Sequence, residues 1–286
     1  MNKFDYLIKK IEDGKFENTP FKHLHIKNFL IEDDFKQIIN SEQINLNNCS
    51  DDNELISKLS KNKYEIIDFP GCVKDIDEYI EWHKTKEKTA RIHSATSGFG
   101  LTYRLTEPKD EIISELHKFS QSEEFSDCLM KKFNINAENY RSDIGIQKFL
   151  DGYEISPHPD IRSKAITFMF NINPSNSSEN NDHHTQLLEF KKEHKYLEEL
   201  WSDTSKIERS WVPWNWCKVT KQLNDNNSII IFAPNNNTLH AVKANYNHLD
   251  YQRTLLYGNI WLTPSSYQIM SWEHIEELNL LRKHNL

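Results

Sequence analysis

Residues 227–262 read NSIIIFAPNNNTLHAVKANYNHLDYQRTLLYGNIWL. This stretch contains three short runs rich in apolar and β-branched residues, NSIIIFAP (227–234), TLHAVKA (238–244) and RTLLYGNIWL (253–262). Asparagine-rich segments separate the runs, and each run has the length of a strand rather than of a helix. The stretch therefore predicts three strands of a β-rich core.

Similar runs continue toward the N-terminus as far as residue 143. They are DIGIQKFL (143–150), KAITFMFNIN (164–173), TQLLEF (185–190) and WCKVTKQL (216–223). Seven short strands within about 120 residues are typical of an antiparallel jelly roll made of two sheets. In the second run, alternation places Thr167, Met169 and Asn171 on one face, toward a cavity, and the apolar residues between them on the core face.

The first 140 residues predict supporting helices and a short strand. Helical spacing of apolar residues indicates helices near 2–13, after a strand in 21–40, and at 73–87 and 109–133. We expect these helices to cover one sheet, and SWEHIEELNLLRKH (271–284) to form a closing helix. The predicted fold class is thus α+β with a mainly β core, a jelly roll flanked by N-terminal helices and a C-terminal helix.

We expect one domain over residues 1–286. Its parts are a support region (1–140), a jelly-roll core (141–264) and the C-terminal helix (265–286). Within the core, residues 174–226 have the character of an insertion, and the aromatic cluster WVPWNW (211–216) favours a lid over the cavity. The pair His183 and His184 is expected in a solvated loop.

Composition narrows the possible partners and compartments. The chain has 35 Lys and Arg against 43 Asp and Glu, a formal net charge of −8, which disfavours nucleic acid as a partner. No apolar run is long enough to predict a membrane span or a signal peptide. The four widely spaced cysteines favour reduced thiols in a cytoplasmic protein. The sequence leaves the oligomeric state open.

The chemistry is carried by His158 and Asp160 in GYEISPHPD (152–160), and by His240 in a later strand. In extended backbone, residues i and i+2 project to the same side, so His-x-Asp delivers both ligands to one ion. Two imidazoles and one carboxylate occupy one face of an octahedral metal and leave three positions open, an arrangement that suits Fe(II). His240 must approach from a neighbouring strand.

Arg253 begins the last predicted strand, thirteen residues after His240. A guanidinium beside the metal can bind the far carboxylate of a dicarboxylate such as 2-oxoglutarate through two hydrogen bonds. Thr167 and Asn171, on the cavity face of their strand, are candidate contacts of this co-substrate. For both, a polar side chain satisfied within the sheet is an equally good interpretation.

Taken together, these residues resemble the iron(II)- and 2-oxoglutarate-dependent oxygenases of the double-stranded β-helix fold, in particular the prolyl-hydroxylase-like branch. The resemblance covers roughly residues 143–262 and, weakly, FKHLHIKNFLIEDDF (21–35). It implies that iron binds His158, Asp160 and His240, and that Arg253 binds the 2-oxoglutarate tail. The chain departs from the branch at Asn171, where a tyrosine is common. With Asp at position 160, rather than Gly or Ala, the chain resembles the hydroxylases of this family and not its halogenases.

The resemblance implies a dioxygenase that uses Fe(II), 2-oxoglutarate and O2 to hydroxylate an unactivated C–H bond. A small polar metabolite, an amino acid or a sugar-linked compound, is the favoured substrate class. A peptidyl hydroxylase of the prolyl type, acting on a protein, is the nearest alternative. A cupin-like isomerase or a non-catalytic jelly-roll binding module is an alternative of another class, although the His-x-His pair of cupin isomerases is missing here.

Overall fold

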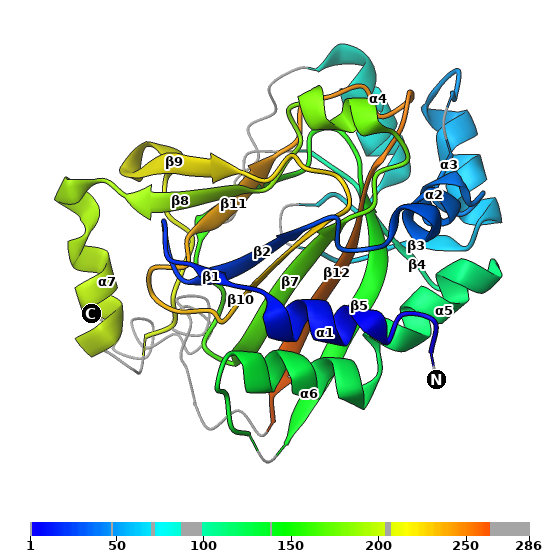
Figure 1. The fold of residues 1–286 in the computed structure, drawn as a ribbon. Coiled ribbons are helices and arrows are strands. Elements are labelled where there is room, and N and C mark those ends of the chain that lie inside the picture. Colours follow the sequence, from blue (N-terminus) through cyan, green and yellow to red (C-terminus); the bar gives the residue numbers. More distant parts are fainter. Residues whose placement is uncertain are drawn as a thin grey trace, which may run out of the picture.

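The computed structural model describes residues 2–46, 48–69, 72–86, 99–137, 139–203 and 207–263. Their strands form one sheet of eight and one of four (Figure 1), and every pairing between named strands of this part is antiparallel. The large sheet runs in the order β1 (Phe16–Glu17), β2 (His23–Lys27), β10 (Ser228–Phe232), β7 (Lys164–Asn171), β12 (Arg253–Leu262), β5 (Tyr140–Phe149), β4 (Thr102–Leu105) and β3 (Tyr64–Ile66). The small sheet runs β6 (Glu154–His158), β11 (His240–Lys243), β8 (Gln186–Phe190) and β9 (Cys217–Gln222).

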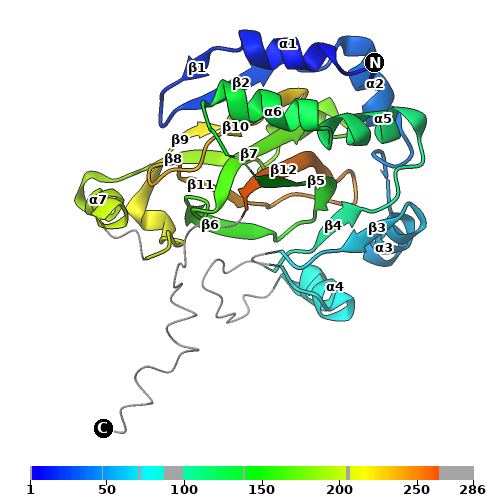
Figure 2. The same ribbon diagram turned by 90° about the horizontal axis from the view of Figure 1, so that it is seen from below.

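Helices cover the face of the large sheet that is turned away from the small sheet, as expected (Figure 2). The helices are α1 (Tyr6–Asp13), α2 (Glu32–Asn40), α3 (Asp52–Lys61), α4 (Ile76–Thr85), α5 (Glu111–Ser120), α6 (Glu123–Lys132) and α7 (Tyr196–Asp203), with 3-10 turns η1 (Asn176–Asn180), η2 (Lys192–His194) and η3 (Trp214–Trp216). The amphipathic helix α5 packs on β5 and α6 packs on β7, while α1 packs on α6. No helix of the described residues is both long and apolar enough to cross a lipid bilayer.

Strand β7 separates two apolar cores, as its alternating sequence predicts. Phe168 and Phe170 belong to the core beneath the helices, whereas Met169 belongs to the core between the two sheets. The core between the sheets is aromatic and takes residues from both of them, including Phe149, Tyr153 and Tyr257. The space between the sheets is therefore walled by side chains that exclude water.

The observed elements differ from the predicted ones in several places, and α3 and β3 were not predicted. Residues 109–133 form two helices, because Ser122 accepts a hydrogen bond from the amide of Phe125 and so begins a new helix. Strand β6 was not predicted, since Pro157 interrupts its pattern. Within the expected insertion at 174–226, the strands predicted at 185–190 and 216–223 are present as β8 and β9 of the small sheet. The expected helix at 271–284 lies outside the described residues.

Candidate metal centre

The small sheet brings the two predicted histidines together. Strands β6 and β11 are neighbours, and in their antiparallel register His240 pairs directly with His158. Asp160 follows two residues after His158, just beyond the end of β6. A ligand pair from one local segment and a third ligand from the adjacent strand thus meet at one end of the space between the sheets.

The three side chains are buried and their donor atoms face one another. The Nε2 atoms of His158 and His240 each lie 3.8 Å from a different carboxylate oxygen of Asp160, and the two rings are 4.3 Å apart between centroids. Donor atoms bound to one transition-metal ion lie roughly 3–4 Å from each other. The spacing of these donors therefore fits a bound ion.

Backbone carbonyls fix the tautomer of both imidazoles. His158 Nδ1 lies 2.8 Å from the carbonyl of Ser156, and His240 Nδ1 lies 3.0 Å from that of Thr238. A carbonyl only accepts, so both Nδ1 atoms donate and the lone pairs remain on Nε2. Burial, with a smaller contribution from His240, lowers the pKa of His158 to about 3, and burial also lowers the pKa of His240. Both rings are thus held in the neutral form that binds metals.

Asp160 is held on both oxygens by neighbouring side chains. Lys164 donates to Oδ1 at 2.7 Å, and Thr167 donates to Oδ2 at 2.6 Å. Burial opposes ionisation of this carboxyl, but the charge and the hydrogen bond of the Lys164 ammonium act against it, and the pKa of Asp160 is lowered. The carboxylate is therefore charged and fixed in orientation, as a metal ligand requires.

Arg253, at the start of β12, reaches across from the large sheet to the small one. Its side chain is 2% exposed, lies over the ring of Phe149 at 4.8 Å, and donates from Nη2 to Thr185 Oγ1 at 2.9 Å. Its Nε has no partner, and no carboxylate in the described ranges lies within ion-pair distance of the guanidinium. Burial lowers its pKa only to about 10, so the group stays charged at neutral pH. A buried, unpaired cation of this kind fits an anionic ligand.

The position of Thr185 relates Arg253 to the histidines. Leu187 of β8 pairs with His240, and Thr185 lies two residues earlier, on the same face. Two residues along a strand span about 7 Å, so Arg253 contacts the small sheet one step away from the imidazoles. A short dicarboxylate can bridge this distance.

The other two predicted co-substrate contacts have partners elsewhere. Asn171 donates from Nδ2 to the carbonyls of Leu223 and Asp225, at 3.1 and 3.0 Å, and so joins β7 to the segment after β9. Thr167 lies against Asp160, and its hydroxyl is also 3.1 Å from Asn259. Both side chains thus have hydrogen-bond partners within the protein. This agrees with the alternative interpretation of the sequence, in which they are polar groups satisfied within the sheet.

Sequence reasoning missed Lys164, which bonds Asp160, and Thr185, which bonds Arg253. The only signals were that Lys164 stands four residues after Asp160 and that Thr185 stands at the start of a predicted strand. The expectation for His183 and His184 was wrong, because both are buried, at 0% and 2% exposure. The ring of His183 packs at 4.6 Å on that of Tyr246, in the aromatic core. A pair of neutral imidazoles packs there as aromatic rings do.

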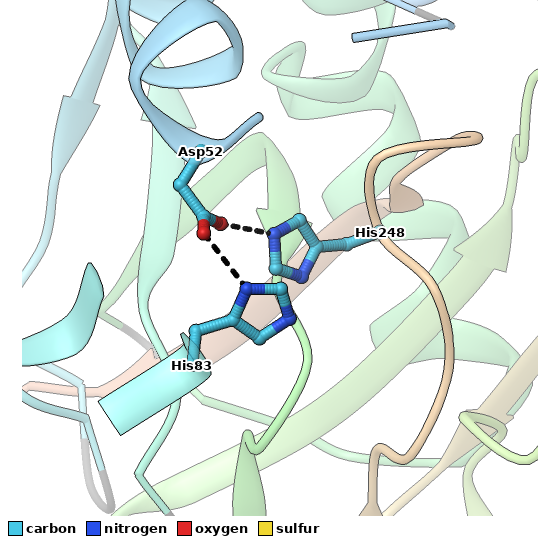
Figure 3. A group of neighbouring side chains, drawn as sticks. All are labelled: Asp52, His83 and His248. Carbon is cyan, nitrogen blue, oxygen red and sulfur yellow. Dashed lines mark hydrogen bonds and ion pairs between the residues drawn. The ribbon is translucent and has the colours of Figure 1, made fainter. Parts of the chain in front are cut away.

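A second group of two histidines and one aspartate lies where α3, α4 and the connection between β11 and β12 meet (Figure 3). Asp52 accepts hydrogen bonds from His83 Nδ1 and His248 Nε2, both at 2.8 Å. On the far side of its ring, His248 Nδ1 accepts from the backbone amide of Asp151 at 3.3 Å. The distances and donors describe a hydrogen-bonded cluster.

No protein-family model matches the chain, and a comparison with curated proteins finds no relative. Solved structures that resemble it include a prolyl-4-hydroxylase from Pseudomonas putida, with 8% identity over 91% of this chain and 98% of that one, at a TM-score of 0.40. The epimerase SnoN in complex with Fe3+, alpha-ketoglutarate and nogalamycin RO has 9% identity over 91% and 83%, at 0.43. HygX from Streptomyces hygroscopicus, with nickel, 2-oxoglutarate and hygromycin B bound, has 10% identity over 73% and 86%, at 0.32. Because these likenesses are weak, the function proposed below depends on the geometry of this chain's own residues.

Proposed function

We propose that the protein is an iron(II)- and 2-oxoglutarate-dependent dioxygenase that hydroxylates a C–H bond of a small polar metabolite. One observation carries this proposal: a buried His-x-Asp plus His group lies between the two sheets together with a buried arginine that has no anionic partner among the described residues. On this proposal the two sheets are the halves of a double-stranded β-helix. We also propose the cytoplasmic location that the four widely spaced cysteines predict.

His158, Asp160 and His240 would hold Fe(II), and Arg253 would bind the far carboxylate of 2-oxoglutarate. When bound, the iron and 2-oxoglutarate supply the activation of O2, so that R–H, O2 and 2-oxoglutarate become R–OH, succinate and CO2. The residues of the chain have three tasks around this chemistry. They orient the ligands, bind the co-substrate and keep water away.

The metal ligands are oriented by the groups that are hydrogen-bonded to them. The carbonyls of Ser156 and Thr238 direct both Nε2 atoms inward, and Thr167 with Lys164 fixes the carboxylate. The aromatic core between the sheets excludes solvent and strengthens the attraction between Arg253 and a carboxylate. Thr185 holds one arm of the guanidinium and leaves Nε for the ligand.

The proposal is tested by loading purified protein with Fe(II) without oxygen and adding 2-oxoglutarate. We expect one iron per chain, a visible charge-transfer absorption band on addition of 2-oxoglutarate, and succinate once O2 is admitted. In His158→Ala and Asp160→Ala the band should be lost, and in Arg253→Met the dissociation constant of 2-oxoglutarate should rise about 10–100-fold. His194→Ala, which loses only a stacking contact with Trp216, is the control. Iron-loaded wild-type protein that gives neither band nor succinate rules the proposal out.

A further inference from the structure

The segment that covers the outer edge of β6 runs antiparallel to it. The amide of Val212 donates to the carbonyl of Pro157 at 2.8 Å, and at the other end Glu208 accepts from the amide of Arg162 at 3.1 Å. Counting from the backbone contact between Val212 and Pro157 places Trp211 beside His158 and Arg209 beside Asp160. The ring of Trp211 lies 6.3 Å from that of His158, in agreement with this count.

Alternation along this segment turns Arg209 and Trp211 to the same side. Trp211 packs on the core between the sheets, whereas Val212 packs on a separate core with α7. Residues two apart in extended backbone share a face, so Arg209 is directed toward the interior beside the metal centre.

Arg209 is buried and its guanidinium donates no hydrogen bond within the described part of the chain. The residue is 6% exposed, and its Nε has no hydrogen-bond partner. Glu208 is 4.0 Å away, too far for a hydrogen bond, and that carboxylate already accepts from the amides of Arg162 and Arg209. The indole nitrogen of Trp211 is likewise buried without a partner. In the described part of the chain, two buried donors beside the metal ligands therefore lack a hydrogen-bond acceptor, although Glu208 lies within ion-pair distance of Arg209. Such an arrangement is costly unless a ligand accepts from them.

The neighbouring cationic side chains already donate to acceptors within the protein, and Arg209 differs from them in this respect. Lys164 is paired with Asp160, and the guanidinium of Arg162 donates to the backbone carbonyls of Trp201 and Ile207. Arg253 lies across the space between the sheets, against Thr185. Arg209 is thus the charged donor that remains for a molecule bound next to His158 and Asp160.

We propose that the substrate carries an oxyanion, a carboxylate or a phosphate, which Arg209 binds beside the metal centre with Trp211 as a second donor. This inference rests on the proposed function and narrows its substrate class to an acidic metabolite, such as an amino acid or a sugar phosphate. The oxyanion is bound away from the reacting carbon, so Arg209 positions the substrate and takes no part in the oxidation.

The test uses the anaerobic protein loaded with Fe(II) and 2-oxoglutarate, whose charge-transfer band reports on the iron. Matched probes are titrated against it: N-acetyl amino acids against their primary amides, and sugar phosphates against the parent sugars. We expect members of one acidic series to shift the band and to stimulate succinate formation, while their neutral partners do neither. The series that responds distinguishes a carboxylate from a phosphate.

Variants connect the response to the two side chains. For the responding acid, Arg209→Gln should raise the apparent dissociation constant about 10–100-fold and Trp211→Phe about 2–10-fold, with the 2-oxoglutarate constant unchanged. Arg209→Lys should keep part of the affinity, because lysine retains the positive charge but lacks the planar guanidinium that can donate two parallel hydrogen bonds. Arg141→Gln, an exposed arginine whose guanidinium lies over the ring of Trp261, should match wild type.

Different results separate this inference from the proposed function. A band that never forms contradicts the proposed function itself. A band that forms but responds equally to acids and neutral partners, or to no acid at all, overturns the role of Arg209 alone. Unchanged affinity for the acid in Arg209→Lys and Trp211→Phe also overturns the role of Arg209. These two conservative variants provide the test if Arg209→Gln does not fold.

Discussion

Two clusters in this chain have the same composition, two histidines and one aspartate, and similar ring separations of 4.3 and 4.2 Å. In the cluster of His158, Asp160 and His240, the imidazole nitrogens lie 3.8 Å from the carboxylate oxygens. In the cluster of Asp52, His83 and His248 they lie at 2.8 Å. The wider spacing leaves room for an ion, whereas the shorter one is that of a direct hydrogen bond.

The difference originates at the far nitrogen of the rings. In the first cluster each Nδ1 donates to a carbonyl, so each Nε2 faces Asp160 as a lone pair. At His248 the backbone amide of Asp151 donates to Nδ1, so Nε2 carries the proton and donates to Asp52. The partner on the outer side of the ring thus decides whether such a group can bind a metal or ties segments together.

The largest expected contrast is in metal affinity. Asp160→Ala should lower the affinity for Fe(II) or Zn(II) by more than about 100-fold, since loss even of a group behind a ligand costs about 10–100-fold. Asp52→Ala should leave both affinity and stoichiometry unchanged, because its cluster is already hydrogen-bonded. Competition with a metal-chelating dye measures both. Binding of two ions per wild-type chain contradicts the comparison.

The second contrast is in stability. Asp52 accepts two hydrogen bonds from imidazoles that come from α4 and from the connection between β11 and β12. Asp52→Asn keeps one acceptor oxygen and replaces the other by an NH2 donor, so one of the two imidazole N–H groups loses its acceptor. The change should lower the free energy of unfolding by about 3 kcal/mol. Urea denaturation followed by circular dichroism measures the loss. Asp13→Asn, an exposed aspartate at the end of α1, is the control, and equal losses in the two variants contradict the assignment.

The first cluster could be predicted from sequence and the second could not. His158 and Asp160 stand in one short segment, and the order of the strands makes His240 a neighbour. Asp52, His83 and His248 come from three distant segments without characteristic spacing, so only the packing of α3 and α4 unites them. The strands of the core followed from their apolar runs. The short strand β6 did not, because its proline and the turn before it obscure the alternation.

Polar residues around the first cluster were harder to assign. The face of β7 that carries Thr167 followed from alternation, but its partner did not, since a hydroxyl can bond a co-substrate or a carboxylate equally well. For Arg209, nothing in the sequence indicates that the segment crosses β6 in antiparallel order. Contacts between segments far apart in the chain decide such roles.

A smaller effect on metal affinity is expected from the hydroxyl of Thr167, which is hydrogen-bonded to Asp160. Thr167→Val keeps the shape of the side chain but removes the hydroxyl that donates to Oδ2. We expect metal affinity to fall about 10-fold, because the carboxylate is then held by Lys164 alone. The same dye competition measures the change. Thr220→Val, the same change at an exposed threonine of β9, serves as the control. A tenfold loss in the control as well would show that the hydroxyl of Thr167 is not responsible.

The smallest effect concerns the pH dependence of the second cluster. Burial lowers the pKa of His248, and the hydrogen bond to Asp52 offsets only part of this. As the pH falls below the ordinary value of about 6.5, the unfolded chain takes up a proton that the folded imidazole does not. The free energy of unfolding therefore decreases toward acid pH, by at most about 1.4 kcal/mol per pH unit for this one group.

His248→Gln removes this titration and keeps a side-chain donor that can reach Asp52. The variant should be less stable than wild type at pH 7, yet lose less stability between pH 7 and pH 5, because it has one buried imidazole fewer. Urea denaturation at a series of pH values gives the slope for both proteins. Since other buried histidines remain, such as His184 with a pKa lowered by burial to about 4, the slope of the variant is reduced and not abolished. Identical slopes would mean that His248 is protonated in the folded protein, which the amide donating to its Nδ1 forbids.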